Sequence, residues 1–327
     1  RQVAATAGVS RATASRVISG STLVSEEARA AVEAAISELG FVPSSAARSL
    51  ALGRSDFIAL VLPEPNSRVL SDPFFGQVIL GLSDALDEND KQMVLLLARP
   101  GQRTDRVSDY LAGYHVDGAV IASHHRDDRL NQRAVDLDLP CVFIGRPHHI
   151  GRGRYVDMDN VAGARLATER LIAIGRRRVA TIAGPADMSA GTDRVAGWRA
   201  ALDDAGLDSS RVASGDFTQL GGGVATRKLL SQHPDVDAVF AASDLMAAGA
   251  IDELTRSGYR VPEDVAVMGF DNFPVAESTH PPLSTVDHPV VEMARAAGRM
   301  LLAQIDGTAV DPDPLMFTPQ LVLRESA

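Results

Sequence analysis

From Phe57 onward, short apolar segments rich in β-branched residues alternate with amphipathic segments of helical spacing. A first series, between residues 57 and 145, contains FIALVLP, QMVLLLA, GAVIAS and CVFIG. A second series begins near residue 163 and contains VATIAG, VASGD, AVFAAS and DVAVMGF. This alternation is typical of parallel sheets with right-handed crossovers, whose strands are buried on both faces. Two series of similar size predict two α/β lobes with a cleft between them.

The length of the chain supports more than one domain. A single compact core seldom extends over 327 residues. The segment 290–307 has helical spacing, and 314–326 contains one or two strands, so we expect the chain to cross between the lobes near its end. The single cysteine, Cys141, excludes a disulfide framework and fits a reducing cytoplasm. No run of eighteen apolar residues and no signal-peptide pattern is present in the sequence.

Residues 1–43 have a different pattern and predict a headpiece of three short helices. The first is QVAATAG, and the second begins after Ser10, which is a good N-cap. The third begins after Ser25, with acidic residues in its first turn, and ends before Gly40. The side chains expected to form one small core are Val3, Ala4, Ala7, Ala14, Val17, Ile18, Ala28, Val32, Ala35, Ile36 and Leu39.

The second of these helices has the features of a DNA-recognition helix. A helix, a glycine turn and a second helix that presents Arg11 and Arg16 match the geometry that enters the major groove. Arginine reads guanine with two hydrogen bonds, whereas serine and threonine hydroxyls bind phosphates. Residues 1–55 contain six Arg and four Glu, which gives this segment a net charge of +2. Because the whole chain has a net charge of −10, the remaining residues have a net charge of −12. A positive end on an acidic body favours DNA binding over the alternative, an ordinary helical hairpin with a solvated face.

The segment 44–56 is expected to be a linker. Pro43 and two serines interrupt the helical pattern, and AARSLA is too short to be a stable helix alone. Its order is therefore expected to depend on its surroundings.

Two long segments, VAATAGVSRATASRVISG and VSEEARAAVEAAISELGFVPSSAARSLA, resemble the headpiece and hinge of the LacI/GalR family of bacterial transcriptional repressors. The resemblance extends through SDPFFGQVILGL, GRRRVATIAGP, ASDLMAAGAIDEL and DVAVMGFDN, and so covers nearly the whole chain. It implies a helix-turn-helix headpiece (1–43), a hinge (44–56) and a two-lobed effector-binding and dimerisation domain of the periplasmic-binding-protein type (57–327). It also implies at least a homodimer on a palindromic operator. No heptad repeat is present near the end of the chain, so we expect a dimer rather than a tetramer.

The resemblance assigns DNA contacts residue by residue. Arg11, Ala12 and Arg16 match base-reading positions, and Leu50 matches the leucine that enters the minor groove and kinks the DNA. Ser44 replaces a frequent Asn, and Gln2 replaces a frequent acidic residue. The full set of expected DNA contacts is Ser10, Arg11, Ala12, Thr13, Ser15, Arg16, Ser19, Ser25, Ser44, Ala47 and Leu50.

The cleft is expected to bind a small carbohydrate. A neutral sugar offers hydroxyls and an apolar ring face, so its pocket needs arginine donors, carboxylate acceptors and an aromatic surface. In the family, positions matching Arg194 and Asp271 hold the effector and the one matching Phe217 stacks on it. The full set of candidates is Phe74, Arg146, Asp187, Met188, Arg194, Trp198, Phe217, Ser243 and Asp271.

Several of these candidates have alternative explanations. Arg194 and the adjacent Asp193 could form a solvated ion pair, and Asp271 could cap a turn. Trp198 could be a core residue, because it falls on the same helix face as the apolar Val195. Ser243 and Arg146 stand where other members have different polar residues, so the sequence does not identify the sugar. The segment GPADMSAGTDRVAGW resembles the actinobacterial members that respond to cellobiose and other β-glucosides.

Other functions have less support in the sequence. The pairs His124–His125 and His148–His149 lack the spacing of a zinc site, GGGVA lacks the lysine of a phosphate-binding loop, and DMSAG lacks the first glycine of a nucleophile elbow. We therefore expect no enzyme, metal or cofactor. A sugar-binding protein of the periplasmic type without DNA function is the main alternative, but it leaves the basic headpiece unexplained.

Overall fold

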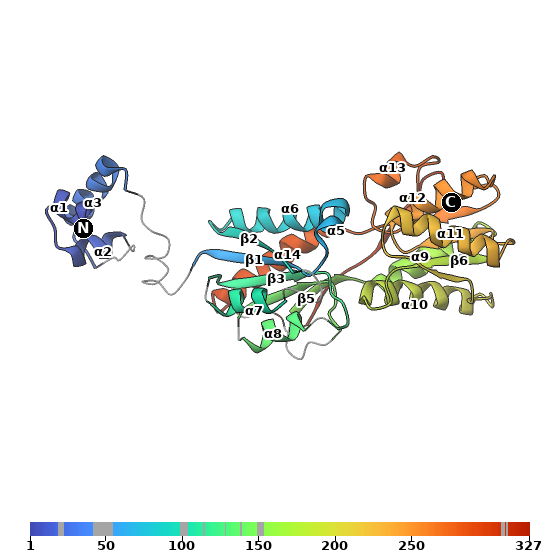
Figure 1. Cartoon of the computed structure of the whole chain (residues 1–327), viewed down its shortest axis with the longest axis horizontal. Coiled ribbons are helices and arrows are strands. Elements are labelled where there is room, and N and C mark those ends of the chain that lie inside the picture. The colour runs from blue at the N-terminus through green and yellow to red at the C-terminus, as the bar shows by residue number, and fades with distance from the viewer. Residues whose placement is uncertain are drawn as a thin grey trace.

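The computed structural model describes residues 1–18, 23–41, 55–98, 104–113, 115–127, 129–137, 139–148, 154–308, 311 and 313–327 (Figure 1). Four expected DNA contacts, Ser19, Ser44, Ala47 and Leu50, lie outside these residues. Among the described helices, none is long and apolar enough to cross a membrane.

The headpiece contains the three predicted helices, α1 (Gln2–Thr6), α2 (Arg11–Ile18) and α3 (Glu26–Leu39). The side-chain oxygen of Ser10 accepts a hydrogen bond from the Thr13 amide (3.0 Å), and that of Ser25 accepts one from the Ala28 amide (3.3 Å). Gly40 ends α3 in the left-handed conformation that glycine tolerates. The buried core is Val3, Ala4, Ala14, Val17, Val32 and Ala35. The prediction for Leu39 was wrong: it lies in the last turn of α3, is 41% exposed and is not part of the headpiece core.

Lobe 1 is built on a parallel six-stranded sheet in the order β11-β5-β4-β3-β1-β2. The strands are β1 (Phe57–Leu62), β2 (Gln92–Leu97), β3 (Gly118–Ala122), β4 (Cys141–Ile144), β5 (Arg154–Met158) and β11 (Leu315–Phe317). The helices are α5 (Asn66–Ser71), α6 (Pro73–Asp87), α7 (Thr104–Ala112), α8 (Leu130–Asp136) and α14 (Val290–Ile305). Alternate residues of β1 face opposite layers: Leu60 packs with α6 and α14, whereas Val61 packs with α7 and α8.

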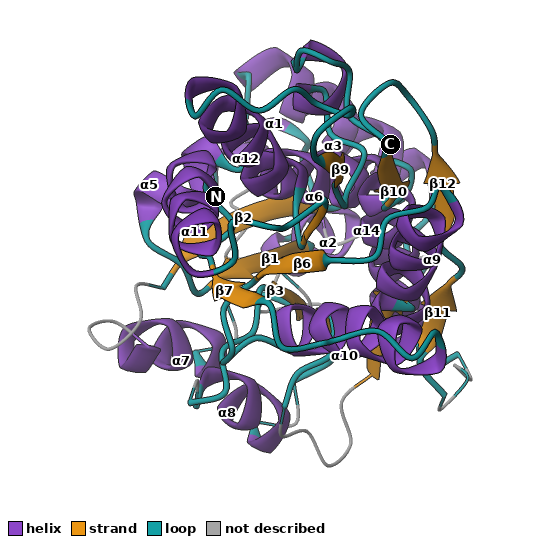
Figure 2. Cartoon of the chain, turned by 90° about the vertical axis from the view of Figure 1, so that its right-hand side faces the viewer, coloured by secondary structure: helices purple, strands orange, loops and turns teal. Residues whose placement is uncertain are grey.

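Lobe 2 repeats this plan with a parallel four-stranded sheet in the order β7-β6-β8-β9. The strands are β6 (Val179–Ala183), β7 (Val212–Ser214), β8 (Ala238–Ala241) and β9 (Ala266–Met268). The helices are α9 (Asn160–Ala173), α10 (Ser189–Asp204), α11 (Gln219–Gln232), α12 (Asp244–Arg256) and the short α13 (Val275–Ser278). The pairs α9–α10 and α11–α12 cover opposite faces of the sheet, as the end-on view in Figure 2 shows.

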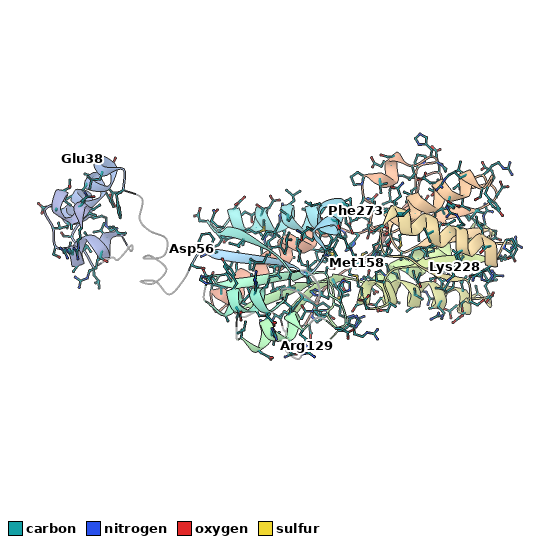
Figure 3. All side chains as sticks on the ribbon, in the orientation of Figure 1. Glu38, Asp56, Arg129, Met158, Lys228 and Phe273 are labelled. Atoms are coloured by element: carbon teal, nitrogen blue, oxygen red, sulfur yellow. The ribbon has the colours of Figure 1, made fainter. Side chains whose placement is uncertain are left out.

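The chain passes between the lobes three times. It leaves lobe 1 after β5, returns between β10 (Thr285–Asp287) and α14, and crosses again between β11 and β12 (Gln320–Val322). Strand β12 pairs antiparallel with β10, and the Ser326 carbonyl accepts a hydrogen bond from the amide of Val267 in β9. Figure 3 shows Met158 and Phe273 at the junction of the two lobes. The expected crossing near the end of the chain is therefore confirmed.

Candidate functional site

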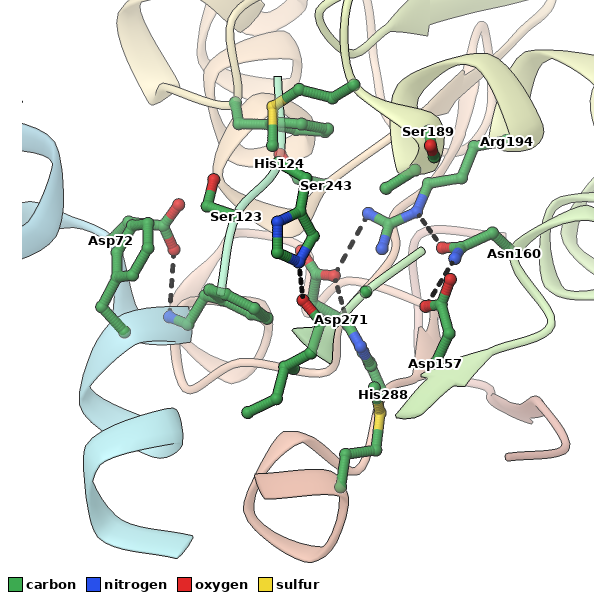
Figure 4. A pocket seen from close by; sticks show the side chains of 18 of the residues that line it. Asp72, Ser123, His124, Asp157, Asn160, Ser189, Arg194, Ser243, Asp271 and His288 are labelled. Carbon is green, nitrogen blue, oxygen red and sulfur yellow. Dashed lines mark hydrogen bonds and ion pairs between the residues drawn. The ribbon is translucent and has the colours of Figure 1, made fainter. Parts of the chain in front are cut away.

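A cavity open to solvent lies between the two lobes. It contains about 780 Å³ of empty space, a volume that includes open solvent. Lobe 1 contributes the ends of its strands and the start of α6, and lobe 2 contributes α10 and the loops after its strands (Figure 4). The polar and charged residues that line it are Arg68, Asp72, Ser123, His124, Arg146, Asp157, Asn160, Ser189, Arg194, Ser243, Asp271 and His288.

Arg194 is the central cation of this cavity. It lies on α10 and is only 4% exposed. Its Nε donates to Asn160 Oδ1 (2.9 Å), and its Nη1 donates to the Ala242 carbonyl (2.7 Å) and lies 3.3 Å from Asp271 Oδ1. The guanidinium also stacks on the Phe270 ring, 3.6 Å from its centroid. Burial lowers the pKa of Arg194, whereas the charge of Asp271 opposes that shift. The position of the guanidinium is therefore fixed before any ligand arrives.

The Arg194 contacts belong to a continuous polar network, visible as dashed lines in Figure 4. On one side, Asn160 Nδ2 donates to Asp157 Oδ1 (3.2 Å) in lobe 1. On the other, His288 Nδ1 is 3.1 Å from Asp271 Oδ1. Burial raises the pKa of Asp157, while amides of Met158 and Arg146 stabilise its charge. The network joins both lobes through residues next to two of the crossing segments.

Asp72 offers a hydrogen-bond acceptor from lobe 1. Its Oδ1 accepts from the Phe74 amide (3.0 Å) at the start of α6. Burial raises the pKa of Asp72 to about 6, an effect that this hydrogen bond opposes. At neutral pH the carboxylate is therefore mainly ionised and can accept hydroxyl hydrogen bonds.

Phe217, from lobe 2, forms an aromatic wall of the cavity. Its backbone has a φ of 62°, which is unusual for a residue other than glycine. Its ring lies against Gly184, where an added Cβ would be 2.3 Å from the ring carbon Cζ. The guanidinium carbons of Arg68 and Arg194 are 5.6 and 5.9 Å from the ring centroid. The absence of a side chain at Gly184 therefore leaves room for the tip of the Phe217 ring beside the end of β6, and the ring lines the cavity there.

Seven of the nine effector candidates line the cavity: Phe74, Arg146, Met188, Arg194, Phe217, Ser243 and Asp271. Arg146 donates to Asp193 across the lobes (2.7 Å), and Ser243 caps α12 through the Met246 amide (3.2 Å).

The structure places the other two candidates, Trp198 and Asp187, outside the residues that line the cavity. Trp198 has no exposed surface, because its ring fills the core between α9, α10 and the sheet of lobe 2. Asp187 lies outside the residues that line the cavity, because its carboxylate turns to His125 (2.7 Å).

Sequence reasoning missed several polar residues of the cavity, including Asp72, Asp157, Asn160, His124 and His288. Asp72 had a detectable signal, since an aspartate before a proline that opens a helix is an N-cap pattern. Asp157 lies in β5, a strand that was not predicted because Arg154 and Asp157 interrupt its apolar pattern. His124 and His125 were considered only as zinc ligands; within the described residues, no three His, Cys, Asp or Glu side chains are arranged to hold a metal ion.

The candidate DNA surface lies on α2. Ser10, Arg11, Ala12, Ser15 and Arg16 are exposed, and Thr13 is half-buried. Ala14 and Val17 face the headpiece core. Ser25 is also exposed, at the start of α3. The arginines expected to read bases therefore share an outward-facing surface of one helix.

Comparisons with known proteins match both the headpiece and the two lobes. The lacI family of bacterial regulatory proteins matches residues 1–44, and the periplasmic binding protein-like domain matches residues 168–327. The chain is 48% identical to the HTH-type transcriptional regulator CelR of Thermobifida fusca, over 99% of this chain and 96% of that protein. It is 33% identical to the ribose operon repressor of Escherichia coli K12, over 100% of this chain and 99% of the repressor.

Two solved structures resemble the whole chain. A complex of the transcriptional regulator CelR with cellobiose has a TM-score of 0.81 and 47% identity, over 100% of this chain and 98% of that one. A lac repressor dimer bound to operator and the anti-inducer ONPF has a TM-score of 0.85 and 25% identity, over 99% of this chain and 97% of that one. These matches cover the headpiece and both lobes, and they confirm the fold expected from the sequence. The chain belongs to the LacI family of bacterial regulatory proteins.

Proposed function

We propose that this regulator represses sugar-utilisation genes and that a small neutral carbohydrate in the cavity controls its binding to operator DNA. The single observation that carries the choice of ligand is the charge pairing of the cavity. Arg68, Arg146 and Arg194 pair with Glu64, Asp193 and Asp271 respectively. Because each of these arginines already has a carboxylate partner, the site suits a ligand with hydroxyls better than an anion.

The shape of the site also fits a sugar. Asp72 and Asp157 supply acceptors, Arg194 supplies donors, and Phe74 and Phe217 supply aromatic faces. Cellobiose is the bound sugar in the related CelR complex, and it is therefore the first ligand to test.

The DNA contacts extend the same proposal. A homodimer places two copies of α2 in successive major grooves of a palindromic operator, and Leu50 enters the minor groove between them. The lac repressor structure shows a related dimer on its operator. A regulator of this kind acts in the cytoplasm, and its action includes no catalytic step.

Fluorescence anisotropy with an inverted-repeat duplex tests the proposal. We expect a preference for this duplex over a scrambled one, a steep loss of affinity with added salt, and a 5- to 150-fold change on adding cellobiose. Ribose serves as the control sugar. Cellobiose binding without any DNA preference would favour the alternative, a sugar-binding protein without DNA function.

A further inference from the structure

His125 is held between two carboxylates that belong to different lobes. Its Nε2 lies 3.0 Å from Glu64 Oε1, in the loop after β1, and its Nδ1 lies 2.7 Å from Asp187 Oδ2, in the loop after β6. A carboxylate only accepts hydrogen bonds, so both ring nitrogens must donate and the imidazole must carry a positive charge. Glu64 is nearly fully buried and also accepts from Ser123 Oγ (2.5 Å) and Arg68 (3.0 Å).

His125 lies in the loop after β3, and the backbone of this loop is also joined to that of the loop after β6. His125 forms an isolated antiparallel bridge with Met188, and the Arg126 amide donates to the Asp187 carbonyl (2.8 Å). His148 Nε2 lies 3.0 Å from that carbonyl. The residues next to these contacts, Ser123 and His124 in lobe 1 and Met188 and Ser189 in lobe 2, line the cavity. Contact between the loops therefore fixes the positions of residues that line the cavity from lobe 1 and from lobe 2.

These contacts lie away from the segments that connect the lobes. In lobe 1, β3 is separated by β4 from β5, where the chain crosses to lobe 2. In lobe 2, β6 is separated by β8 from β9, which is bridged to the β10 segment. Opening of the lobes about the crossing segments would thus separate His125 from Asp187.

We propose that His125 is a positioning residue whose ionised side chain, held by Glu64 and Asp187, joins the two lobes in the arrangement of this structure, which we call closed, and so sets the affinity of the cavity for its ligand. The effect on ligand affinity rests on the proposed function, whereas the fastening of the lobes does not. We name the three residues His125, Glu64 and Asp187 the interlobe clasp.

The clasp makes closure dependent on pH. Hydrogen bonding to Glu64, and then to Asp187, raises the pKa of His125 to about 9, against the effect of burial. When the lobes open, His125 loses its contact with Asp187 and its pKa falls, so closing the lobes takes up a proton. Closure is therefore favoured at neutral pH and weakens as the pH rises through about 9. Among the described residues, the ionisable groups beside the clasp include Arg68, Arg126, His124, His148 and Asp72, whose charge interacts with that of Glu64. Burial lowers the pKa of His124 to about 4, so it is neutral in this range.

A second cross-lobe ion pair provides an internal comparison. Arg146 and Asp193 also join the lobes, but arginine keeps its charge throughout this pH range. Only the clasp is therefore expected to respond to alkaline pH. Since the Asp187 side chain is 51% exposed, solvent screens its attraction and the response should be several-fold rather than complete.

The distance between the lobes can be measured without any ligand. Gln132 on α8 and Arg199 on α10 are exposed and follow the two clasp loops, so Gln132→Cys and Arg199→Cys provide sites for a spin-label pair. Cys141 is buried, and burial raises its pKa to about 11, so it should resist labelling. Electron–electron distances are measured in the full chain at pH 7 and pH 10, diluted with unlabelled protein so that each dimer carries one labelled protomer.

We expect one short distance at pH 7 and a growing long-distance population at pH 10. His125→Gln and the isosteric Asp187→Asn should each show a long-distance population at both pH values, with little change between them. A pH response of the same size in both variants, or no response in the parent chain, would overturn the proposal. Because Asp187 is half-exposed, its variant tests the clasp even if His125→Gln folds poorly.

Calorimetric titration with cellobiose supplies the functional readout. The parent chain should bind cellobiose several-fold more weakly at pH 10 than at pH 7, and His125→Gln should have a flatter profile. If the spin-label distances respond as expected and cellobiose does not bind, the clasp stands and the proposed sugar is wrong. If cellobiose binds with the same pH profile in both proteins, the clasp does not set affinity.

Discussion

The headpiece and the cavity both depend on arginine, but they present it in opposite ways. Arg11 and Arg16 are exposed on α2, a helix that contributes Ala14 and Val17 to a small core of alanines and valines among the described headpiece residues. Arg194 is almost fully buried, and its donors are directed to Asn160, Ala242 and Asp271 before any ligand binds. The exposed arginines suit a polyanion whose phosphates release counterions, whereas the buried one suits a neutral ligand recognised by geometry.

Because of this difference, DNA binding and ligand binding should respond differently to salt and to substitutions. Binding at the headpiece should depend strongly on salt, because its charges face solvent. Binding in the cavity should depend little on salt and strongly on the positions of a few buried groups. Variants on each side should therefore fail in different assays.

The largest effect is expected for Arg194→Met. Removing one partner of a buried ion pair costs about 3–5 kcal/mol of stability, because Asp271 and its neighbours lose their cation. Urea unfolding should show this loss, and cellobiose should no longer alter operator binding. Arg165→Met is the matched control, since Arg165 forms exposed ion pairs on α9, and it should leave both properties unchanged. An Arg194→Met protein that still responds to cellobiose would remove Arg194 from the site.

Acidification should weaken the lobes through His124. The pKa of this buried imidazole is lowered to about 4, so the unfolded chain binds more protons and stability is lost as pH falls from about 6.5 to 4. The loss amounts to roughly 3 kcal/mol for this residue. His124→Gln keeps a donor for the Ile144 carbonyl but does not titrate. Urea unfolding at pH 7 and pH 4.5 should show a smaller loss in the variant than in the parent; an equal loss would contradict the assignment.

Arg11→Ala should weaken operator binding by about 1–3 kcal/mol, the value of a bidentate contact to a base. Its exposed position on α2 predicts no loss of cellobiose affinity. Arg199→Ala removes the same charge from lobe 2 and serves as the control in anisotropy titrations at constant salt. Equal weakening by the two variants would indicate a general charge effect rather than base reading.

The smallest effect is expected for Ser10→Ala, which removes the cap of α2 and costs about 1 kcal/mol of local stability. Amide hydrogen exchange in α2 should become faster while exchange in the lobes stays unchanged. Ser10→Asn restores a capping oxygen and should restore protection. Unchanged exchange in Ser10→Ala would show that α2 is held by its core contacts alone.

Elements with a regular pattern of apolar and capping residues could be predicted from the sequence. Helical spacing located α1, helical spacing with a capping serine located α2 and α3, and uninterrupted apolar runs located β1, β3, β4, β6 and β8. The pattern failed where polar residues occupy a strand, as in β5, and where elements are very short, as in α5, α13 and β10. The cavity was only partly predicted, because Asp72, His124 and His288 are brought together by packing of distant segments rather than by spacing in the sequence.

His125 and Asp187 show the same limit. Sixty-two positions separate these residues, and each alone is an ordinary surface polar residue. Only the apposition of two strand ends from different lobes makes them an ion pair. Trp198 shows the converse, since its type suggested a ligand surface and its position on α10 directed it to the core.

The central claim is that occupancy of the cavity and binding of the headpiece to DNA are coupled, and reciprocity tests it most directly. Cellobiose affinity is measured for the free regulator and for the regulator saturated with its operator duplex. Linkage requires the ratio of these affinities to equal the ratio of operator affinities with and without cellobiose, and we expect both to be about 5- to 150-fold. Identical cellobiose affinity in the free and operator-bound protein would contradict the account.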